Sequence, residues 1–281
     1  MIRVGPAGWA YEDWNGIVYP QPRPRGFDPL THLARYFDTV EINSTFYRPA
    51  TADTARKWVA RVAEGDRFRF TAKAWQRFTH ARDEALTRAD VAAAREALDV
   101  IRDAGRLGAV LLQFPWSFKR DDDARAWLDD ATRALADFPL ALEVRHASWN
   151  VPAFYRELAE RGIGFVNIDQ PLFARSLGPS ATATAPVGYV RLHGRNYEDW
   201  FREGAGVEER YDYLYSADEL RPWADRTRKI AERSGDVYVV TNNHFNGQSV
   251  ANAVMLAAML GDDPHPPAPA GVAARYDLAV D

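Results

Sequence analysis

Short apolar runs alternate with amphipathic segments along almost the whole chain. Eight of these runs have the length and composition of buried strands. Several of these runs become polar at their end. In Leu140–Val144, Glu143 lies within the run and Arg145 follows it, and the two side chains share one phase of the strand. The predicted strands are Ile2–Val4, Thr39–Ile42, Phe68–Thr71, Val110–Leu112, Leu140–Val144, Gly164–Asn167, Tyr189–Leu192 and Val237–Thr241.

Helical periodicity fills most of the intervals between the strands. Thr51 stands at the start of one of these segments and Ser216 precedes another, both in the manner of N-terminal caps. Residues 194–215, after the seventh strand, lack such periodicity and are expected to form a long loop at the active face. The predicted helices are Pro29–Phe37, Thr51–Ala63, Thr87–Ala104, Asp121–Ala136, Val151–Arg161, a stretch near Leu172–Leu177, Asp218–Arg233 and Asn246–Leu260.

Strands that alternate with helices in this number predict one α/β domain, a single (β/α)8 TIM barrel, over residues 1–260. An open doubly wound sheet is the alternative. It is disfavoured because the loop after the first strand has Gly5 and Gly8 but lacks the third glycine of a dinucleotide-binding turn. Residues 261–281 are rich in proline and alanine and are expected to form a loosely ordered tail.

Composition bears on partners more than on the fold. The formal net charge of −4 argues against a protein that chiefly coats nucleic acid or an anionic membrane. The sequence has no cysteine, which excludes disulfides, a thiolate nucleophile and a cysteine-based metal site. It has no cleavable leader and no run of membrane-spanning length, so we expect a soluble cytoplasmic protein without a membrane partner.

Polar residues follow seven of the strands, at the end where a TIM barrel gathers its catalytic groups. We therefore expect these side chains to converge on one cavity. Aromatic residues in the loops after strands could stack on sugar rings or bases, or pack on one another as a lid. The candidate site residues are Trp9, Glu41, Asn43, Tyr47, Lys73, Gln113, Glu143, Arg145, His146, Asn167, Asp169, Arg191, His193, Asn242, Asn243 and His244.

The charged candidates suggest acid–base chemistry on an anion. Glu41 and Glu143 could be general acid and base, or each could be a buried acid paired with an arginine. Lys73 could be a Schiff-base nucleophile, an anion anchor or a solvated loop residue. Arg145 and Arg191 suit bidentate recognition of a carboxylate or phosphate. Replacing Arg191 by methionine is expected to weaken anion binding by about 1.5–3 kcal/mol.

His193 is expected to transfer protons or to support Glu143. With His244 and either Glu143 or Asp169 it could also bind a divalent metal, but these residues are scattered and show no HxxxH or HxH spacing. We therefore predict no metal site, no organic cofactor and no structural metal needed for folding.

Several longer strings, in order along the chain, resemble the family called domain of unknown function 72, whose members have a TIM-barrel fold. The resemblance extends from near residue 2 to near residue 260 and implies that fold without implying a reaction. Ala74 and Trp75 stand where the family usually has a proline, and Thr241 stands where it often has phenylalanine. The strings are GPAGW, VEINSTFY, FRFTAK, LLQFP, LEVRHASW, YVRLHGRNYEDW and NNHFNGQSVANA.

Three functions are compatible with these residues. The first is a cofactor-independent enzyme, in its least specific form a hydrolase, that acts on an anionic small molecule, a sugar or a nucleotide. Its catalytic residues would be Glu41, Lys73, Glu143 and His193. The second is a nucleic-acid-processing protein that uses a divalent metal and has a basic, aromatic-lined groove. The third is a non-catalytic ligand-binding barrel. We adopt the first.

Overall fold

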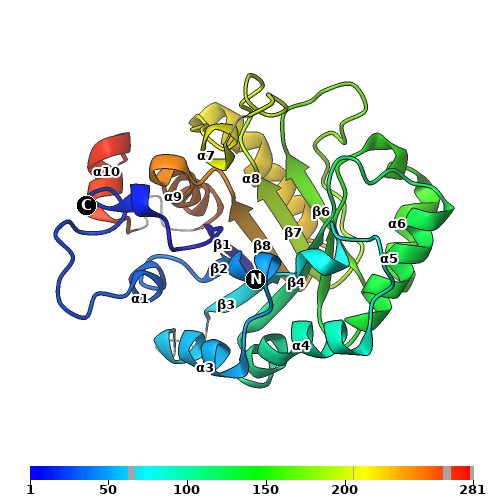
Figure 1. Cartoon of the computed structure of the whole chain (residues 1–281). Coiled ribbons are helices and arrows are strands. Elements are labelled where there is room, and N and C mark those ends of the chain that lie inside the picture. Colours follow the sequence, from blue (N-terminus) through cyan, green and yellow to red (C-terminus); the bar gives the residue numbers. More distant parts are fainter. Residues whose placement is uncertain (63–66, 205, 262–266, 279–281) are drawn as a thin grey trace.

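A ring of eight parallel strands forms the centre of the computed structural model, which describes residues 1–62, 67–204, 206–261 and 267–278 (Figure 1). The strands pair in the order β1-β8-β7-β6-β5-β4-β3-β2. Each predicted strand overlaps an observed one, so the TIM-barrel prediction is confirmed. The strands are β1 Ile2–Pro6, β2 Thr39–Ile42, β3 Arg69–Lys73, β4 Leu107–Gln113, β5 Leu140–Glu143, β6 Gly164–Asp169, β7 Val187–Leu192 and β8 Asp236–Thr241.

The ring is nearly closed between β1 and β2. These strands meet through a bridge between Ala7 and Glu41, beside which the Gly8 N–H donates to the Glu41 carbonyl at 2.9 Å. Gly5 permits the close approach, because a Cβ atom at this position would lie 1.9 Å from the carbonyl oxygen of Thr39. A side chain at position 5 would therefore force the two strands apart.

Helices cover the outside of the ring (Figure 1). Two of the expected caps are present, because the hydroxyls of Thr51 and Ser216 accept hydrogen bonds from the amides of Thr54 and Glu219. The predicted end of the second helix at Ala63 lies outside the described residues. The helices are α1 Pro29–Leu33, α2 Ser44–Tyr47, α3 Ala52–Arg61, α4 Arg88–Asp103, α5 Asp122–Ala134, α6 Pro152–Glu160, α7 Val207–Arg210, α8 Ala217–Ala231, α9 Gln248–Leu260 and α10 Ala270–Tyr276.

The segment after β6 is not helical, so the helix predicted near Leu172–Leu177 was wrong. Its backbone pairs with the chain just beyond β5: the Leu177 N–H donates to the Arg145 carbonyl, and the Ala147 N–H donates to the Arg175 carbonyl, both at 2.8 Å. Arg175 has a φ of 71°, in the left-handed region that does not continue an α-helix. Tertiary pairing therefore overrides the weak helical pattern of this segment.

Two segments are more regular than predicted. The long loop after β7 contains the one-turn helix α7, and the expected loose tail contains α10. Val272 and Ala273 of α10 are buried, and the Tyr276 hydroxyl donates to the Asn246 carbonyl at 2.6 Å. The tail is therefore packed against the barrel over 270–276, while 262–266 and 279–281 lie outside the described residues. Among the described helices, none is both long and apolar enough to cross a membrane.

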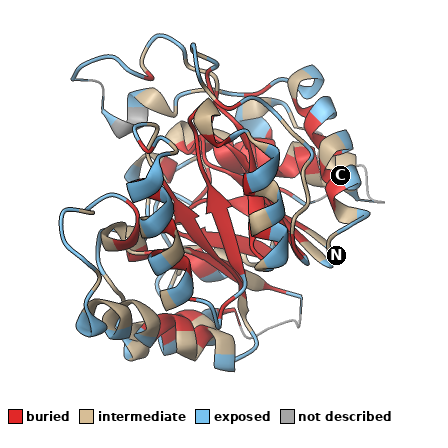
Figure 2. Ribbon diagram, turned by 90° about the vertical axis from the view of Figure 1, so that its right-hand side faces the viewer, coloured by how far each residue is buried: buried red, intermediate tan, exposed pale blue. Residues whose placement is uncertain are grey.

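The buried residues are concentrated on the strands and on the helix faces turned toward them (Figure 2). On β7, Val190 and Leu192 belong to the apolar layer between strands and helices. Tyr189 and Arg191, in the opposite phase, reach across the barrel interior to Glu41. The interior near the carboxyl ends of the strands is therefore polar, although it is fully buried.

Candidate functional site

A cavity of about 810 Å³ opens at the carboxyl ends of the strands. Nine of its lining side chains are aromatic and three are cationic, namely Lys73, Arg145 and Arg210, and no described lining residue is a carboxylate. The lining residues are Gly8, Trp9, Ala10, Tyr11, Asn43, Ser44, Phe46, Tyr47, Trp58, Lys73, His80, Gln113, Pro115, Trp116, Arg145, Trp200, Phe201, Arg210, Tyr211, Asn242 and His244.

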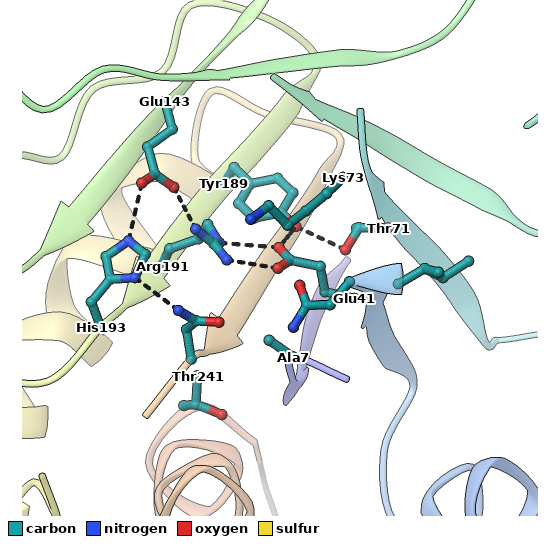
Figure 3. A network of polar contacts seen from close by, with 12 residues as sticks. Ala7, Glu41, Thr71, Lys73, Glu143, Tyr189, Arg191, His193 and Thr241 are labelled. Atoms are coloured by element: carbon teal, nitrogen blue, oxygen red, sulfur yellow. Dashed lines mark hydrogen bonds and ion pairs between the residues drawn. The ribbon is translucent and has the colours of Figure 1, made fainter. Parts of the chain in front are cut away.

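An ion-pair network fills the barrel beneath this cavity (Figure 3). Arg191 on β7 donates through Nε and Nη2 to the two carboxylate oxygens of Glu41 on β2, at 3.0 and 2.7 Å. Its Nη1 donates to Glu143 on β5 at 2.7 Å. The three side chains are at most 1% exposed. Arg191 therefore uses each of its nitrogens within the protein, which is unfavourable to its predicted role as a ligand for a substrate anion.

Glu143 connects the buried network to the cavity wall. Its Oε1 accepts a hydrogen bond from Nε of Arg145 at 2.9 Å and lies 3.1 Å from Nε2 of His193. The other ring nitrogen of His193 lies 3.1 Å from the amide nitrogen of Asn242. With that amide as donor, the imidazole proton resides on Nε2, which lies between Oε1 of Glu143 and Nη2 of Arg145, the latter at 3.3 Å. Because a guanidinium nitrogen cannot accept, the proton points to Glu143. His193 therefore lies beside Glu143, the residue that it was expected to support.

Tyr189 and Thr71 extend the network toward the middle of the barrel, and neither was among the sequence candidates. The Tyr189 hydroxyl donates to Oε2 of Glu41 at 2.8 Å and accepts from Thr71, whose Oγ1 lies 2.8 Å away. Each residue precedes a candidate by two positions, Tyr189 before Arg191 and Thr71 before Lys73. The period of two along a strand is the signal that could have found them.

Burial and pairing set the protonation states of the network. Burial alone would raise the pKa of Glu143, but the charges of Arg191 and Arg145 outweigh it and hold that pKa well below its usual range. Burial lowers the pKa of His193 to about 3, because Glu143 offsets only part of the desolvation. At neutral pH, Glu143 is therefore a carboxylate and His193 a neutral imidazole.

Lys73 lies above this network at the end of β3 and lines the cavity (Figure 3). Its Nζ lies 4.1 Å from the centroid of the Phe46 ring, and it has no hydrogen-bond partner among the described residues. Burial, followed by the charge of Arg191, lowers the pKa of Lys73 to about 8. A neutral amine is therefore accessible near neutral pH, as proton transfer or nucleophilic attack requires.

Several other polar atoms of the lining have no protein partner. The Nη1 of Arg145 makes no hydrogen bond within the described part of the chain, whereas its Nε is held by Glu143. Buried polar atoms of Asn43 (Oδ1), Trp116 (Nε1), Arg210 (Nε) and His244 (Nδ1) also lack a partner there. Because buried polar atoms in proteins are nearly always hydrogen-bonded, these atoms favour a ligand that offers both donors and acceptors.

The structure divides the predicted site residues among three places. Eight line the cavity, four lie buried beneath it, and four lie away from it. The cavity group is Trp9, Asn43, Tyr47, Lys73, Gln113, Arg145, Asn242 and His244. The buried group is Glu41, Glu143, Arg191 and His193.

Asn167 and Asp169 on β6 are placed away from the cavity, contrary to the expectation. Asn167 donates to the Thr182 carbonyl at 2.9 Å and so holds the segment that follows β6. Asp169 accepts from Arg195 at 2.7 Å and from the indole of Trp223 on α8. Both residues have the outward phase of β6, so period two still governs the strand, but the phase was misassigned.

Asn243 and His146 are likewise outside the cavity. Asn243 donates to the Tyr213 carbonyl at 2.7 Å and to Oδ1 of Asn252 at 2.8 Å, which ties the long loop to α9. Nδ1 of His146 accepts from the Ser148 amide at 3.1 Å and so shapes the turn after β5. Both side chains therefore serve the loops around the cavity.

The long loop after β7 supplies lining residues that the strand-end pattern did not identify, notably Arg210 and Tyr211. Their only signal in the sequence is the length of the loop itself. Among the described residues, no three His, Asp or Glu side chains gather as ligands for a metal ion. His193 faces the interior of the barrel, whereas Asp169 faces α8.

Comparisons with known proteins agree on one family. The family model described as "Protein of unknown function DUF72" matches residues 3–273. The UPF0759 protein YunF of Bacillus subtilis is 29% identical over 273 residues, which cover 92% of this chain and 95% of that protein. The crystal structure of a DUF72 family protein from Thermotoga maritima is 31% identical, with a TM-score of 0.79 over 92% of this chain and 99% of that one. A DUF72 family structure from Enterococcus faecalis, 23% identical, shares the fold with a TM-score of 0.80 over 92% and 95% of the two chains.

Proposed function

The chain belongs to the DUF72 family, and we propose that it is a cofactor-independent enzyme that binds an anionic small molecule in the cavity and acts on it by acid–base chemistry. The observation that carries this proposal is the lining itself, with three cationic side chains, nine aromatic ones and no carboxylate among its described residues. The volume of about 810 Å³ lies within the usual range of about 300–1,000 Å³ for small-molecule sites. A sugar phosphate or a nucleotide combines the anion with a part that can stack on aromatic rings.

The charge near the floor of the cavity favours an anion. Lys73, Arg145 and Arg191 supply three positive charges when the lysine is protonated, and Glu41 and Glu143 supply two negative ones. The difference, 3 − 2, leaves one positive charge, which lies on the cavity side because Arg191 is saturated by both carboxylates. Arg145 and Lys73 are therefore the groups that we expect to contact the anion.

The same geometry changes the expected division of catalytic roles. Glu41 and Glu143 lie buried in the floor of the cavity and do not line it, so we expect neither to reach the substrate and no longer prefer a hydrolase with two acting carboxylates. Lys73 is the group with both access to the cavity and a pKa of about 8, suited to giving or taking a proton. Glu143 and His193 would act by positioning Arg145.

Calorimetric titration with inorganic phosphate, ribose 5-phosphate and adenosine monophosphate tests this proposal. We expect all three to bind, and the ligands with a ring to bind more tightly than phosphate. Proton NMR of each bound compound over time then tests for turnover. No binding at millimolar concentration would contradict the anionic substrate, and binding without change of any ligand would favour the non-catalytic barrel.

A second candidate function, processing of single-stranded nucleic acid, is favoured by the rim of the cavity. Tyr47 and Phe201 are 65% and 52% exposed there, so their rings are available for stacking on successive bases. Titration of a short oligonucleotide against the mononucleotide, each at two salt concentrations, distinguishes the two functions. A salt-dependent gain for the oligonucleotide would favour this second one.

A further inference from the structure

Lys73 differs from the three other lysines of the chain in its exposure and in its place beside the cavity. Lys57, Lys119 and Lys229 are exposed to solvent. Lys73 is half-buried at the carboxyl end of β3, where its side chain lines the cavity. The strand end that carries it is held by the Thr45 hydroxyl, which donates to the Lys73 carbonyl at 2.7 Å. The chain therefore provides one enclosed amine and three internal references.

The surroundings of Nζ do not satisfy an ammonium group. An ammonium has three donor hydrogens, yet Nζ has no hydrogen-bond acceptor within the described residues and lies against the Phe46 ring at 4.1 Å. The nearby carboxylates of Glu41 and Glu143 are already paired with Arg191. The protein thus offers the ammonium form one cation–π contact and no hydrogen bond within its described part, so the neutral amine is reached more readily than in a solvated lysine.

We propose that Nζ of Lys73 forms an imine with the carbonyl carbon of an aldehyde or ketone that also carries a carboxylate or phosphate. This inference rests on the proposed function, since it names the chemical class of the anionic substrate. The Nη1 of Arg145, which has no acceptor among the described residues, holds the anionic group, while Lys73 contacts the carbonyl group of the same anionic molecule.

The step is balanced without a redox partner. The lone pair of Nζ attacks the carbonyl carbon, a C–N bond forms, and one of the two amine protons moves to the carbonyl oxygen, which becomes a hydroxyl. The C–O bond then breaks, and the hydroxyl leaves as water with the second amine proton, which yields the neutral imine. In its protonated form the imine carries a positive charge close to the place where the Lys73 ammonium would carry one, so the net charge beside the cavity is the same as with the lysine protonated.

The lowered pKa of Lys73, about 8, supports the geometry. For each unit by which the pKa of an amine falls below its usual value, its neutral fraction near neutral pH rises about tenfold. A role as anion anchor alone would be served better by a permanently charged guanidinium. Arg145 and Arg210 already provide such groups in the lining.

Reductive trapping tests the proposal. The protein is incubated near neutral pH with sodium cyanoborohydride and either glyoxylate or glycolaldehyde phosphate, and the modified fraction of each lysine is measured by peptide mass spectrometry. Neutral glycolaldehyde is the matched probe without the anion. We expect Lys73 to react at least about tenfold faster than Lys57 with both anionic probes. With neutral glycolaldehyde, and with inorganic phosphate added to the anionic probes, this advantage is expected to shrink.

Lys73→Arg is the matched variant, because it keeps a cation but removes the nucleophile. It is expected to lose the fast-labelled site and to retain phosphate binding by calorimetry. If Lys73 reacts no faster than Lys57 with either anionic probe, imine formation is overturned, while phosphate binding by the wild type would leave the proposed function standing. If neutral glycolaldehyde labels Lys73 as fast as the anionic probes do, the assignment of an anionic carbonyl substrate is overturned.

Discussion

The floor of the cavity consists of the buried residues Glu41, Glu143 and Arg191, and its wall includes Arg145. The floor and the wall use charged residues in opposite ways. In the floor, Arg191 meets Glu41 and Glu143 with each of its nitrogens, and the three side chains are shut off from solvent. In the wall, Arg145 gives Nε to Glu143, lines the cavity, and has an Nη1 that makes no hydrogen bond within the described part of the chain. A charge that is fully paired serves the fold, whereas a charge that is only partly paired retains the capacity to bind a ligand.

Depth along the barrel axis produces this difference. Arg145 is the second residue beyond the end of β5, while Arg191 lies within β7. Burial is costly for a charge unless its partners are supplied, so the deeper arginine requires two carboxylates. The shallower one shares Glu143 with His193 and is still 9% exposed. The experiments below test whether replacing Arg191 mainly lowers stability and replacing Arg145 mainly weakens ligand binding.

The largest effect is expected for Arg191→Met. Removing the guanidinium leaves Glu41 and Glu143 buried without their shared partner, which should lower the free energy of unfolding by about 3–5 kcal/mol. Urea denaturation measures the loss. Arg221→Met is the control, because Arg221 is 67% exposed in a surface pair with Asp218 and should cost less than about 0.5 kcal/mol. Equal stability of the two variants would mean that the floor is not a structural network.

Arg145→Met is expected to act on binding more than on stability. Loss of a charged hydrogen-bond donor to the ligand should weaken phosphate binding by about 1.5–3 kcal/mol, as measured by calorimetric titration. Glu143 retains Arg191 and His193, so the loss of stability should be smaller than in Arg191→Met. A variant that is strongly destabilised yet binds phosphate normally would reverse the roles assigned to the two arginines.

His193 is expected to make the stability of the floor depend on pH. The unfolded chain takes up a proton on this imidazole near pH 6.5, whereas the folded protein resists it down to about pH 3. The contribution of His193 to the free energy of unfolding is therefore fully present above pH 6.5 and is lost as the pH falls toward 3. Between pH 6.5 and 5 this loss amounts to about 1.5 kcal/mol.

Comparison with His193→Gln isolates this contribution. His80 and His244 also have pKa values lowered by burial to about 4, but they remain in both proteins. Urea denaturation at several pH values should show that, between pH 6.5 and 5, the free energy of unfolding falls less in the variant than in the wild type. Identical pH profiles would indicate that His193 is already protonated in the folded state.

A smaller effect is expected for Tyr189→Phe, which removes the hydrogen bond to Glu41 and the one from Thr71 and should cost about 1–2 kcal/mol. Tyr238→Phe is the matched control on the neighbouring strand. Its ring lies 6.1 Å from that of Tyr189, and its hydroxyl has no hydrogen-bond partner in the described part of the chain. Thermal unfolding of both variants compares them, and a larger loss in Tyr238→Phe would contradict the extent assigned to the network.

Much of the architecture follows from the sequence alone. The positions of the eight strands, the caps of α3 and α8, and the family could all be predicted, because apolar periodicity, capping residues and long ordered strings are local properties. The segment near Leu172–Leu177 could not, because its backbone is fixed by pairing with residues beyond β5. The buried residues of α10 show the same limit, since a Pro/Ala-rich stretch packs only when a surface is present to receive it.

At the candidate site, the sequence by itself determined which residue types stand at the strand ends and that Glu143 and Arg145 share a phase. Tertiary structure decided which phase faces the barrel axis, and so separated Asn167 and Asp169 from the cavity. It also decided how deep each charge lies, which turned Arg191 into a buried partner of two carboxylates and left Arg145 with a donor for the cavity. The physical reason is that desolvation and pairing depend on what the opposite strands contribute, and no local pattern encodes that.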